Sequence, residues 1–410
     1  MNAMLKTTIK NDRRMNERGA ALITTLLIST LLLIVGGALI LTTSMASVLA
    51  IDSTAELQAY YSAEAGANAA LNVLRGNIPS NSANTAATFR NTVDSLNLNP
   101  WLTYNATING TLAVPLSNSP IMGYSINVLD PDSILAPNQP KRLLVNVTGF
   151  GPKGAVKRME MMVDRHIFDY SAISTILIRG NDDNTTQMSN FLVGQSNAKE
   201  YFGIDESNPS NAIPVIGTTH TNDFNMVTTE VNNAKPNTVV GSQQVKQFSV
   251  LQLPSFLQTA DNARAFLTAM QTVAVSEGRY LPASSGSFGT TGNPQFTFID
   301  GNCTLDGGAG LLIVTGNLRL NGGVNFNGLV LVLGAGTIER QGGGEGDILG
   351  AFAIARFART WPVGETGAHP FLEPSYDTSG GGTGLIAFDS SKVDEALSLA
   401  PPRVLAIRER

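Results

Sequence analysis

The sequence predicts an α+β protein with a long N-terminal transmembrane helix, an antiparallel sheet and a β-rich, solenoid-like C-terminal domain. Three observations predict this fold class. A long uncharged run lies near the N-terminus, three β-patterned segments follow it, and the remaining chain alternates short apolar runs with Gly and Asn turns. Forty glycines and 19 prolines are typical of loop-rich β structure, and 43% apolar residues are enough for a sizeable core.

Charge and cysteine content exclude several classes of protein. The formal net charge is −5 over 410 residues, which argues against nucleic acid as a partner. The single cysteine, Cys303, excludes an intrachain disulfide framework. Stability must therefore come from burial and hydrogen bonding.

The N-terminal segment predicts a membrane anchor. Residues 1–19 form a basic leader, and no charged residue occurs from Gly19 to Ile51. About 20 apolar residues cross a bilayer, so this run is longer than a span needs and too long for a cleavable secretory signal. The positive-inside rule places the basic end in the cytoplasm. We expect a single pass through the inner membrane, with residues 20–51 in the membrane and the remainder in the periplasm or outside the cell.

The same helix is expected to continue beyond the membrane, over residues 52–76. This stretch is rich in alanine and lacks proline, and Gly76 and Pro79 would end it. Gly36 and Gly37, inside the apolar run, offer a place where the helix could loosen.

The N-terminal residues resemble a known family. The basic leader ending in Gly19, the uncharged helix and the motif YYSAEAGANAAL, which contains Tyr60, Tyr61, Glu64 and Gly66, are similar to the N-terminal region of PilX-type type IV pilus assembly proteins. The resemblance implies cleavage after Gly19 by prepilin peptidase, methylation of the new N-terminus at Ala20, and packing of the helix against other pilin-like subunits.

Thr24 departs from the pattern of most major pilins. They carry glutamate at the fifth mature position, where this chain has Thr24. The missing carboxylate implies a minor pilin that acts in filament assembly, priming or tip display rather than in the filament shaft. Type II secretion contains a large pseudopilin that also lacks this glutamate, so a secretion pseudopilin is an alternative. Another alternative is an unprocessed membrane anchor.

Residues 77–170 are expected to form the pilin-like β head. Three β-patterned runs, at 123–130, 141–151 and 154–165, are separated by short turns that favour an antiparallel meander. Such a sheet would pack on the exposed half of the helix, as the resemblance implies.

Residues 171–410 are expected to form the β-rich C-terminal domain. The run 311–340 alternates strands with Gly and Asn turns, which fits the rungs of a β-solenoid or, alternatively, tight hairpins. We favour the solenoid because residues 347–359 continue the pattern as a further strand. Helices are expected at 259–277 and 391–399, the latter with a serine cap, and a last strand at 403–410.

The sequence offers little chemistry. His166, His220 and His369 lack the spacing of a metal site, and we expect no metal, no cofactor and no catalytic residues. The acidic turns at 181–184 and 300–302, the latter with Asp306, could hold calcium, but turns also use Asp and Asn side chains to bond their own backbone. Glu345 and Asp347 are the best carboxylate pair for a glycosidase, but they lie in a flexible Gly-rich loop. A membrane-tethered carbohydrate-binding or carbohydrate-active protein, with a surface glycan or other cell-surface ligand as partner, is therefore the runner-up function.

Overall fold

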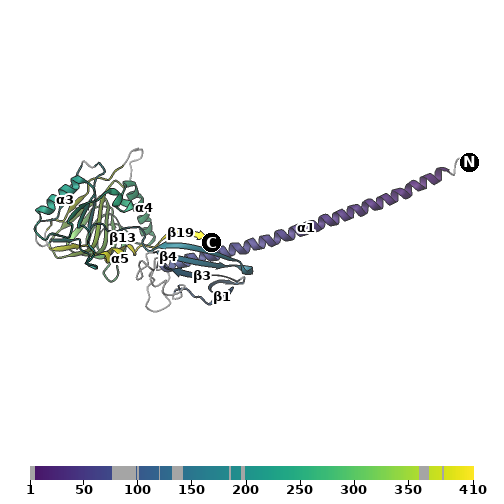
Figure 1. Ribbon diagram of the computed structural model, residues 1–410, viewed down its shortest axis with the longest axis horizontal. Helices are drawn as coiled ribbons and strands as arrows, with labels where there is room; N and C mark the ends of the chain where they lie inside the picture. Colours follow the sequence, from purple (N-terminus) through teal and green to yellow (C-terminus); the bar gives the residue numbers. More distant parts are fainter. Residues whose placement is uncertain are drawn as a thin grey trace. The chain divides into compact units, whose positions relative to one another are not determined.

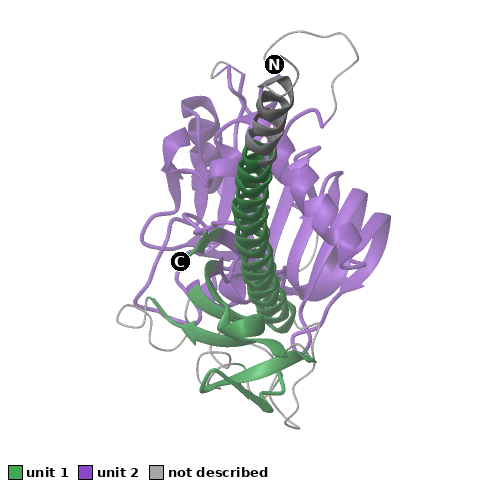
Figure 2. Cartoon of the chain, turned by 90° about the vertical axis from the view of Figure 1, so that its right-hand side faces the viewer, with its two compact units in different colours: residues 1–131, 143–162, 406–410 green, residues 132–142, 163–405 purple. Residues whose placement is uncertain are grey.

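One unbroken helix, α1 (Leu5–Leu74), carries both the predicted span and its extension (Figure 1). The computed structural model describes residues 5–75, 98, 101–119, 121–131, 142–183, 186–194, 199–359, 369–380 and 383–410, with side chains from residue 19 onward. The chain divides into two units (Figure 2): residues 1–131, 143–162 and 406–410, and residues 132–142 and 163–405. We call these the helix–sheet unit and the parallel-sheet unit. The predicted helix end at Gly76 and Pro79 lies outside the described residues, directly after the turn at Arg75.

The helix–sheet unit contains a six-stranded sheet in the order β1-β2-β3-β4-β5-β19. Its strands are β1 (Ala106–Ile108), β2 (Thr111–Asn118), β3 (Ile121–Leu129), β4 (Arg142–Phe150), β5 (Val156–Asp164) and β19 (Arg403–Glu409). Pairing is antiparallel from β1 through β4, with Ile126 opposite Val147. The three predicted runs are β3, β4 and β5, and the predicted last strand is β19, so these expectations are confirmed.

Small residues bring α1 close to this sheet. Ala59 and Ala63 are fully buried, and a Cβ on Gly149 of β4 would lie 2.1 Å from the Ala59 carbonyl oxygen and 2.3 Å from the Ala63 nitrogen. Only glycine leaves room for the helix backbone at that position. Gly151, two residues further along the chain, has the same role, because an added Cβ would lie 2.5 Å from the Ala55 carbonyl oxygen.

The parallel-sheet unit is built on a 13-stranded sheet that curls on itself. Its longest strands are β13 (Gln295–Val314) and β14 (Leu318–Gly334), followed by β16 (Asp347–Arg356) and β12 (Tyr280–Phe288). The shorter strands are β6 (Ile176–Arg179), β7 (Asn190–Leu192), β8 (Lys199–Phe202), β9 (Ile216–Thr218), β10 (Val239–Val240), β11 (Val245–Gln247), β15 (Thr337–Gln341), β17 (Ser375–Asp377) and β18 (Gly384–Ala387).

The long strands stack in parallel rather than as hairpins. Leu311 of β13 pairs with Leu329 of β14, which pairs with Ala351 of β16. The hairpin interpretation of residues 311–340 is therefore wrong, because a hairpin joins antiparallel strands. The observed register is the one expected when each segment lies on the next, and residues 347–356 continue the sheet as predicted.

Both faces of this sheet are buried, which explains its continuous apolar runs. Alternate residues point to opposite sides: Leu311 and Ile313 join one core cluster, and Leu312 and Val314 join the other. The first cluster is completed by residues of α4 (Ala260–Ser276) and α5 (Ser390–Leu397). The second includes Val227 and Val231 of α3 (Thr221–Asn233).

The predicted helices at 259–277 and 391–399 are α4 and α5, whereas α3 was not predicted. The predicted serine cap of α5 is wrong: Asp389 is the N-cap, and its carboxylate accepts from the backbone nitrogens of Ser391 and Lys392. Single-turn 3-10 helices occur at Pro152–Gly154, Val250–Gln252 and Ser255–Leu257.

The expected domain boundary near residue 170 lies close to Val163, where the parallel-sheet unit takes over the chain. The chain returns to the helix–sheet unit at Ala406. Most of the large unit, residues 165–402, thus lies in the sequence between β5 and β19, two strands of one sheet.

Candidate assembly surface on the N-terminal helix

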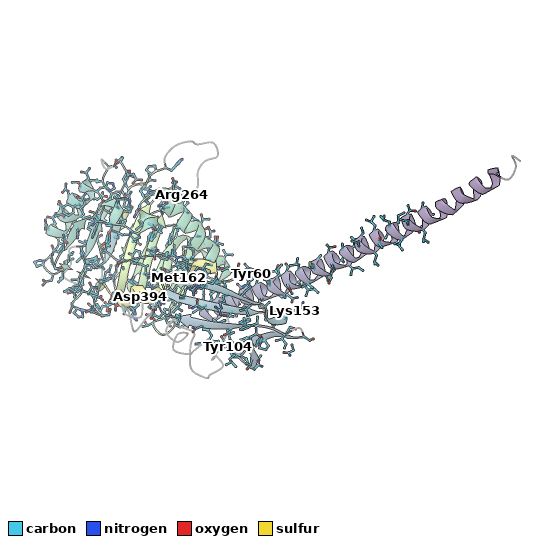
Figure 3. The ribbon with its side chains drawn as sticks, turned by 45° about the vertical axis from the view of Figure 1, so that its right-hand side comes forward. Tyr60, Tyr104, Lys153, Met162, Arg264 and Asp394 are labelled. Atoms are coloured by element: carbon cyan, nitrogen blue, oxygen red, sulfur yellow. The ribbon has the colours of Figure 1, made fainter. Side chains whose placement is uncertain are left out.

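Residues 19–51 of α1 are uncharged, and their large apolar side chains are exposed. The helix from Gly19 to Leu74 contains a window with a mean hydropathy of 2.4, none of it buried, which is long and apolar enough to cross a membrane. Its leucine, isoleucine and valine side chains stand out from the ribbon along its length (Figure 3). This arrangement is consistent with a single-pass membrane protein.

Thr24 is satisfied within its own helix. Its Oγ1 donates to the carbonyl oxygens of Ala20 and Ala21, at 3.1 and 3.0 Å. Thr25, Thr30 and Thr42 make the same kind of bond to the preceding turn. Hydroxyls bonded in this way are compatible with lipid, where an unsatisfied polar group is costly. Thr24 is uncharged, and its hydroxyl is bonded within its own helix.

The predicted processing and hinge positions lie on regular helix. Gly19 and Ala20 are helical and exposed, and nothing lies within 4 Å of where a Gly19 Cβ would be. Gly36 and Gly37 also have open space, and the helix runs through them without a break. Cleavage after Gly19 and methylation of Ala20 stay predictions.

Beyond the apolar run, α1 has two different faces. One face is buried on the sheet and consists of small residues for most of its length: Ala55, Ala59, Ser62, Ala63, Gly66, Ala67, Ala70, Val73 and Leu74. The other face carries large apolar side chains that remain exposed: Leu57 is 48% exposed, Tyr60 37% and Tyr61 58%. We call these three residues, with the exposed Glu64, the outer face of α1.

The outer face is ordered by local contacts. The rings of Tyr60 and Tyr61 pack edge to face, with centroids 6.0 Å apart. Glu64 is one turn further along and exposed. A surface with two tyrosines and a leucine around one carboxylate matches the composition of protein interfaces, where aromatic residues are enriched.

Gly66 lies on the buried face, although it belongs to the motif that suggested assembly. Its Cβ would lie 2.6 Å from Val147 and 2.9 Å from the Tyr124 ring. The glycine therefore lets the helix lie on β3 and β4. Its place in the structure is internal packing.

Ion pairs join the helix to the sheet at its rim. Asp52 and Lys153 are 3.5 Å apart, and Glu56 and Lys157 are 3.8 Å apart. Lys157 also pairs with Glu409 of β19 at 3.0 Å, and the hydrogen bond to Glu409 raises the pKa of Lys157. These pairs are solvent exposed, so each contributes little to stability.

The carboxylates considered for glycosidase chemistry lie in the parallel-sheet unit. Glu345 and Asp347 line a depression of about 480 Å³ together with Glu200. The backbone nitrogen of Asp347 donates a hydrogen bond to Asn325 Oδ1 at 2.9 Å. No aromatic residue lines this depression in the described part of the chain, so a stacking platform for a sugar is missing there.

The acidic turns considered for calcium use their side chains internally. Asp300 accepts hydrogen bonds from Tyr280, Thr315 and Arg359. Asp183 accepts from Thr186, and Asn181 donates to Glu373 at 2.7 Å. Asn184 lies outside the described residues. Among those that are described, no group of three His, Cys, Asp or Glu side chains is arranged to hold a metal.

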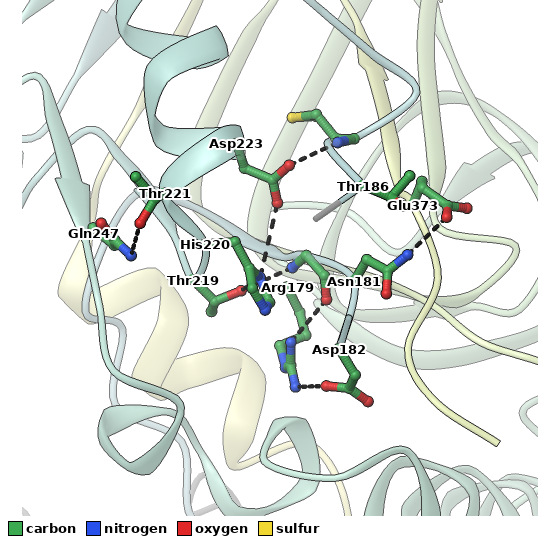
Figure 4. Close-up of polar contacts among 12 residues, drawn as sticks. Arg179, Asn181, Asp182, Thr186, Thr219, His220, Thr221, Asp223, Gln247 and Glu373 are labelled. Carbon is green, nitrogen blue, oxygen red and sulfur yellow. Dashed lines mark hydrogen bonds and ion pairs between the residues drawn. The ribbon is translucent and has the colours of Figure 1, made fainter. Parts of the chain in front are cut away.

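A buried charged network around Arg179 was not predicted (Figure 4). Arg179 is 1% exposed, donates to the carbonyl oxygens of Leu257 and Gly180 at 3.0 and 2.7 Å, and pairs with Asp182. Asp223 is fully buried and accepts from the Met188 nitrogen at 2.6 Å. Burial raises the pKa of Asp223, and burial together with Arg179 lowers that of His220.

The three histidines lie in separate surroundings. His166 lies 3.1 Å from Asp394, His220 contacts Thr219 at 2.8 Å, and the backbone carbonyl of His369 accepts from Arg264. The Arg179 network holds the turn at 181–183, with Arg179 and Asp223 buried and Asp182 exposed at its edge.

Comparisons with known proteins leave the family open. No model of a protein family matches the chain, and a search of curated proteins gives no match. Among solved structures, the chain is similar to the competence-associated pilin ComZ from Thermus thermophilus, at 12% sequence identity and a TM-score of 0.22. The alignment covers 87% of this chain and 98% of ComZ. Since that score is low, the function must be argued from this chain's own residues.

Proposed function

We propose that this protein is a minor pilin-like subunit of a type IV pilus or a related secretion machine. It is inserted in the inner membrane through residues 20–51 and acts in filament assembly, priming or tip display. Its role is structural rather than catalytic. The observation that carries the proposal is the unequal use of α1: one face is buried on the sheet by small residues, and the outer face keeps Leu57, Tyr60 and Tyr61 exposed.

The exposed apolar surface of α1 explains why a partner helix is needed. Exposing such a surface to water is unfavourable, because removing apolar area from water contributes roughly 25 cal/mol of free energy per Å². Lipid covers the first part of the helix before assembly. In a filament, helices of neighbouring subunits would cover both this part and the outer face.

Thr24 supports a place at the tip or in priming. A subunit in the shaft would use a carboxylate at this position to pair with the methylated N-terminus of a neighbour, as the resemblance to pilins implies. Thr24 donates only to its own helix. The subunit therefore relies on apolar packing alone to join its neighbours.

Cysteine crosslinking tests the proposal directly. The native Cys303 is 1% exposed, and burial raises its pKa to about 12, so a new surface cysteine is the only reactive thiol in the variant. We expect Tyr61→Cys to form a crosslink to another pilin-like subunit in cells that produce the filament. The matched control is Arg319→Cys, an exposed position of the parallel-sheet unit. Equal crosslinking of both variants, or none with Tyr61→Cys, would contradict the proposal.

A further inference from the structure

A small groove lies where α1 passes the turn between β4 and β5. Its volume is about 380 Å³. One wall is α1, the other is the tip of the β4–β5 turn, and the lining residues are Ser47, Ala50, Ile51, Thr54, Ala55, Gln58, Pro152 and Lys153. Most of this lining is apolar, and all of it belongs to the helix–sheet unit.

The groove has fixed walls. A Cβ on Gly151 would lie 2.5 Å from the Ala55 carbonyl oxygen, so the base of the turn is held directly against the helix. Lys153 has a positive φ of 56°, a conformation that costs a non-glycine residue energy and is kept only where the surroundings impose it. Figure 3 shows Lys153 at the end of the turn beside α1.

A charge pair lies beside the groove, because Lys153 lines it and pairs with Asp52, which is not a lining residue. Lys153 Nζ lies 3.5 Å from Asp52 Oδ1, and the two side chains are 54% and 58% exposed. Asp52 is the first charged residue after Arg18. The groove thus has an apolar wall and one lining cation, Lys153, and this cation holds an anion, Asp52, beside the groove.

The position along the helix places this pair at the membrane surface. From Gly19 to Ser47 there are 28 residue steps, about 42 Å at 1.5 Å per residue. A bilayer with its headgroups is about 40–45 Å thick. If Gly19 lies at the cytoplasmic surface, as the proposed function requires, Ser47 lies among the outer headgroups, and Asp52, about 7.5 Å further along the helix, lies at their outer edge.

We propose that this groove binds the headgroup of a zwitterionic phospholipid in the outer leaflet. The Lys153 ammonium contacts the phosphate, the Asp52 carboxylate contacts the amine, and Ile51 and Pro152 pack on the glycerol region. An anionic headgroup without an amine would meet the Asp52 carboxylate with like charge. The bound lipid fixes the depth of the subunit before a neighbouring helix replaces the membrane. This inference rests on the proposed membrane insertion of α1.

Lipid retention in nanodiscs tests the inference. The full chain is reconstituted in nanodiscs of equimolar phosphatidylethanolamine and phosphatidylglycerol, and native mass spectrometry counts the lipids that stay bound. We expect phosphatidylethanolamine to be enriched about three-fold, the size of effect expected for an exposed charge pair. Lys153→Gln should abolish the enrichment, and Lys153→Arg should keep it. Asp52→Asn should reverse the preference, because the cation then has no carboxylate beside it.

The matched control is Lys235→Gln, which removes the same charge from an exposed position of the parallel-sheet unit. It should leave the enrichment unchanged. Equal retention of both lipids by the unmodified chain, or a second copy of the chain bound in place of lipid, would overturn the inference. The assay contains no other pilin, so its outcome is separate from the crosslinking of Tyr61→Cys. Enrichment without crosslinking would reject the proposed function alone.

Discussion

The helix–sheet unit and the parallel-sheet unit solve the same packing problem in two ways. In the first, Gly149 and Gly151 give space, so that an α-helix lies directly on a strand. In the second, Gly310, Gly328 and Gly350 pair with one another across β13, β14 and β16, all with positive φ. There glycine gives both space and a backbone conformation that other residues avoid. In both units glycine lets two backbones approach closely, but only in the parallel-sheet unit does it also supply a positive φ.

The largest effect is expected from Gly350→Ala in the parallel-sheet unit. Gly350 has a φ of 142°, and an added Cβ would lie 1.8 Å from the Gly328 carbonyl oxygen. Strain and overpacking add, so we expect a loss of about 4 kcal/mol in the free energy of unfolding. Denaturant unfolding of the full chain in detergent measures it. Gly292→Ala, where an added Cβ has open space, should stay near the original stability, and equal losses in both variants would refute the explanation.

Gly149→Ala should have the next largest effect, in the helix–sheet unit. The added Cβ meets helix backbone but requires no unusual φ, so overpacking alone costs about 3 kcal/mol. Hydrogen exchange of residues 55–74 should accelerate by about 100-fold. Thr148→Ala, on the opposite face of β4, is the control. If hydrogen exchange in β13 and β14 accelerated as much as in α1, the two units would open together rather than independently, which would contradict this explanation.

Arg179→Met tests whether buried charge stabilises the parallel-sheet unit. The substitution removes the donor to the Leu257 carbonyl and the ion-pair partner of Asp182, whose other oxygen still accepts from the Phe371 nitrogen. Because the Asp182 side chain is 35% exposed, we expect a loss of about 2 kcal/mol in the free energy of unfolding. The exposed Arg319→Met, with the same change in charge, should cost well under 1 kcal/mol, in line with other surface substitutions. Thermal or denaturant unfolding distinguishes the two, and a stable Arg179→Met variant would show that the network is dispensable.

The smallest expected effect is a dependence on pH through Asp300. Burial alone would raise its pKa, but hydrogen bonds from Arg359, Tyr280 and Thr315 outweigh burial and hold it below the ordinary value of 3.8. The carboxylate therefore stabilises the fold above pH 3.8, and this contribution is lost as the pH falls through the lowered pKa. In Asp300→Asn, the free energy of unfolding measured at a series of pH values should fall less steeply as the pH drops below 3.8. If the variant showed the same pH dependence as the original chain, Asp300 would not contribute to acid sensitivity.

The sequence predicted the elements better than it predicted the contacts between them. Apolar periodicity and turns located α1, β3, β4, β5, α4, α5 and β19, because these depend on local patterns. The buried face of α1 could also have been found, since Ala55, Ala59, Ala63 and Ala67 recur every fourth residue. The helix α3 was missed because its sequence, TNDFNMVTTEVNN, is polar and rich in poor helix formers.

The Arg179 network could not have been predicted, because it joins residues that are far apart in the chain. Arg179 bonds to Leu257, and Asn181 bonds to Glu373, 192 residues later. Nothing local marks these positions as partners. The outer face of α1, in contrast, was partly visible in the pair Tyr60 and Tyr61, although only the structure separates them from the buried Gly66.

The central claim, that α1 belongs to a pilin-like machine, is tested most directly at the mature N-terminus. Mass spectrometry of the protein from cells with and without prepilin peptidase gives the answer. We expect the chain to begin at a methylated Ala20 only when the peptidase is present. If residues 1–19 stay attached in both strains, α1 is a simple membrane tether and the proposed function is contradicted.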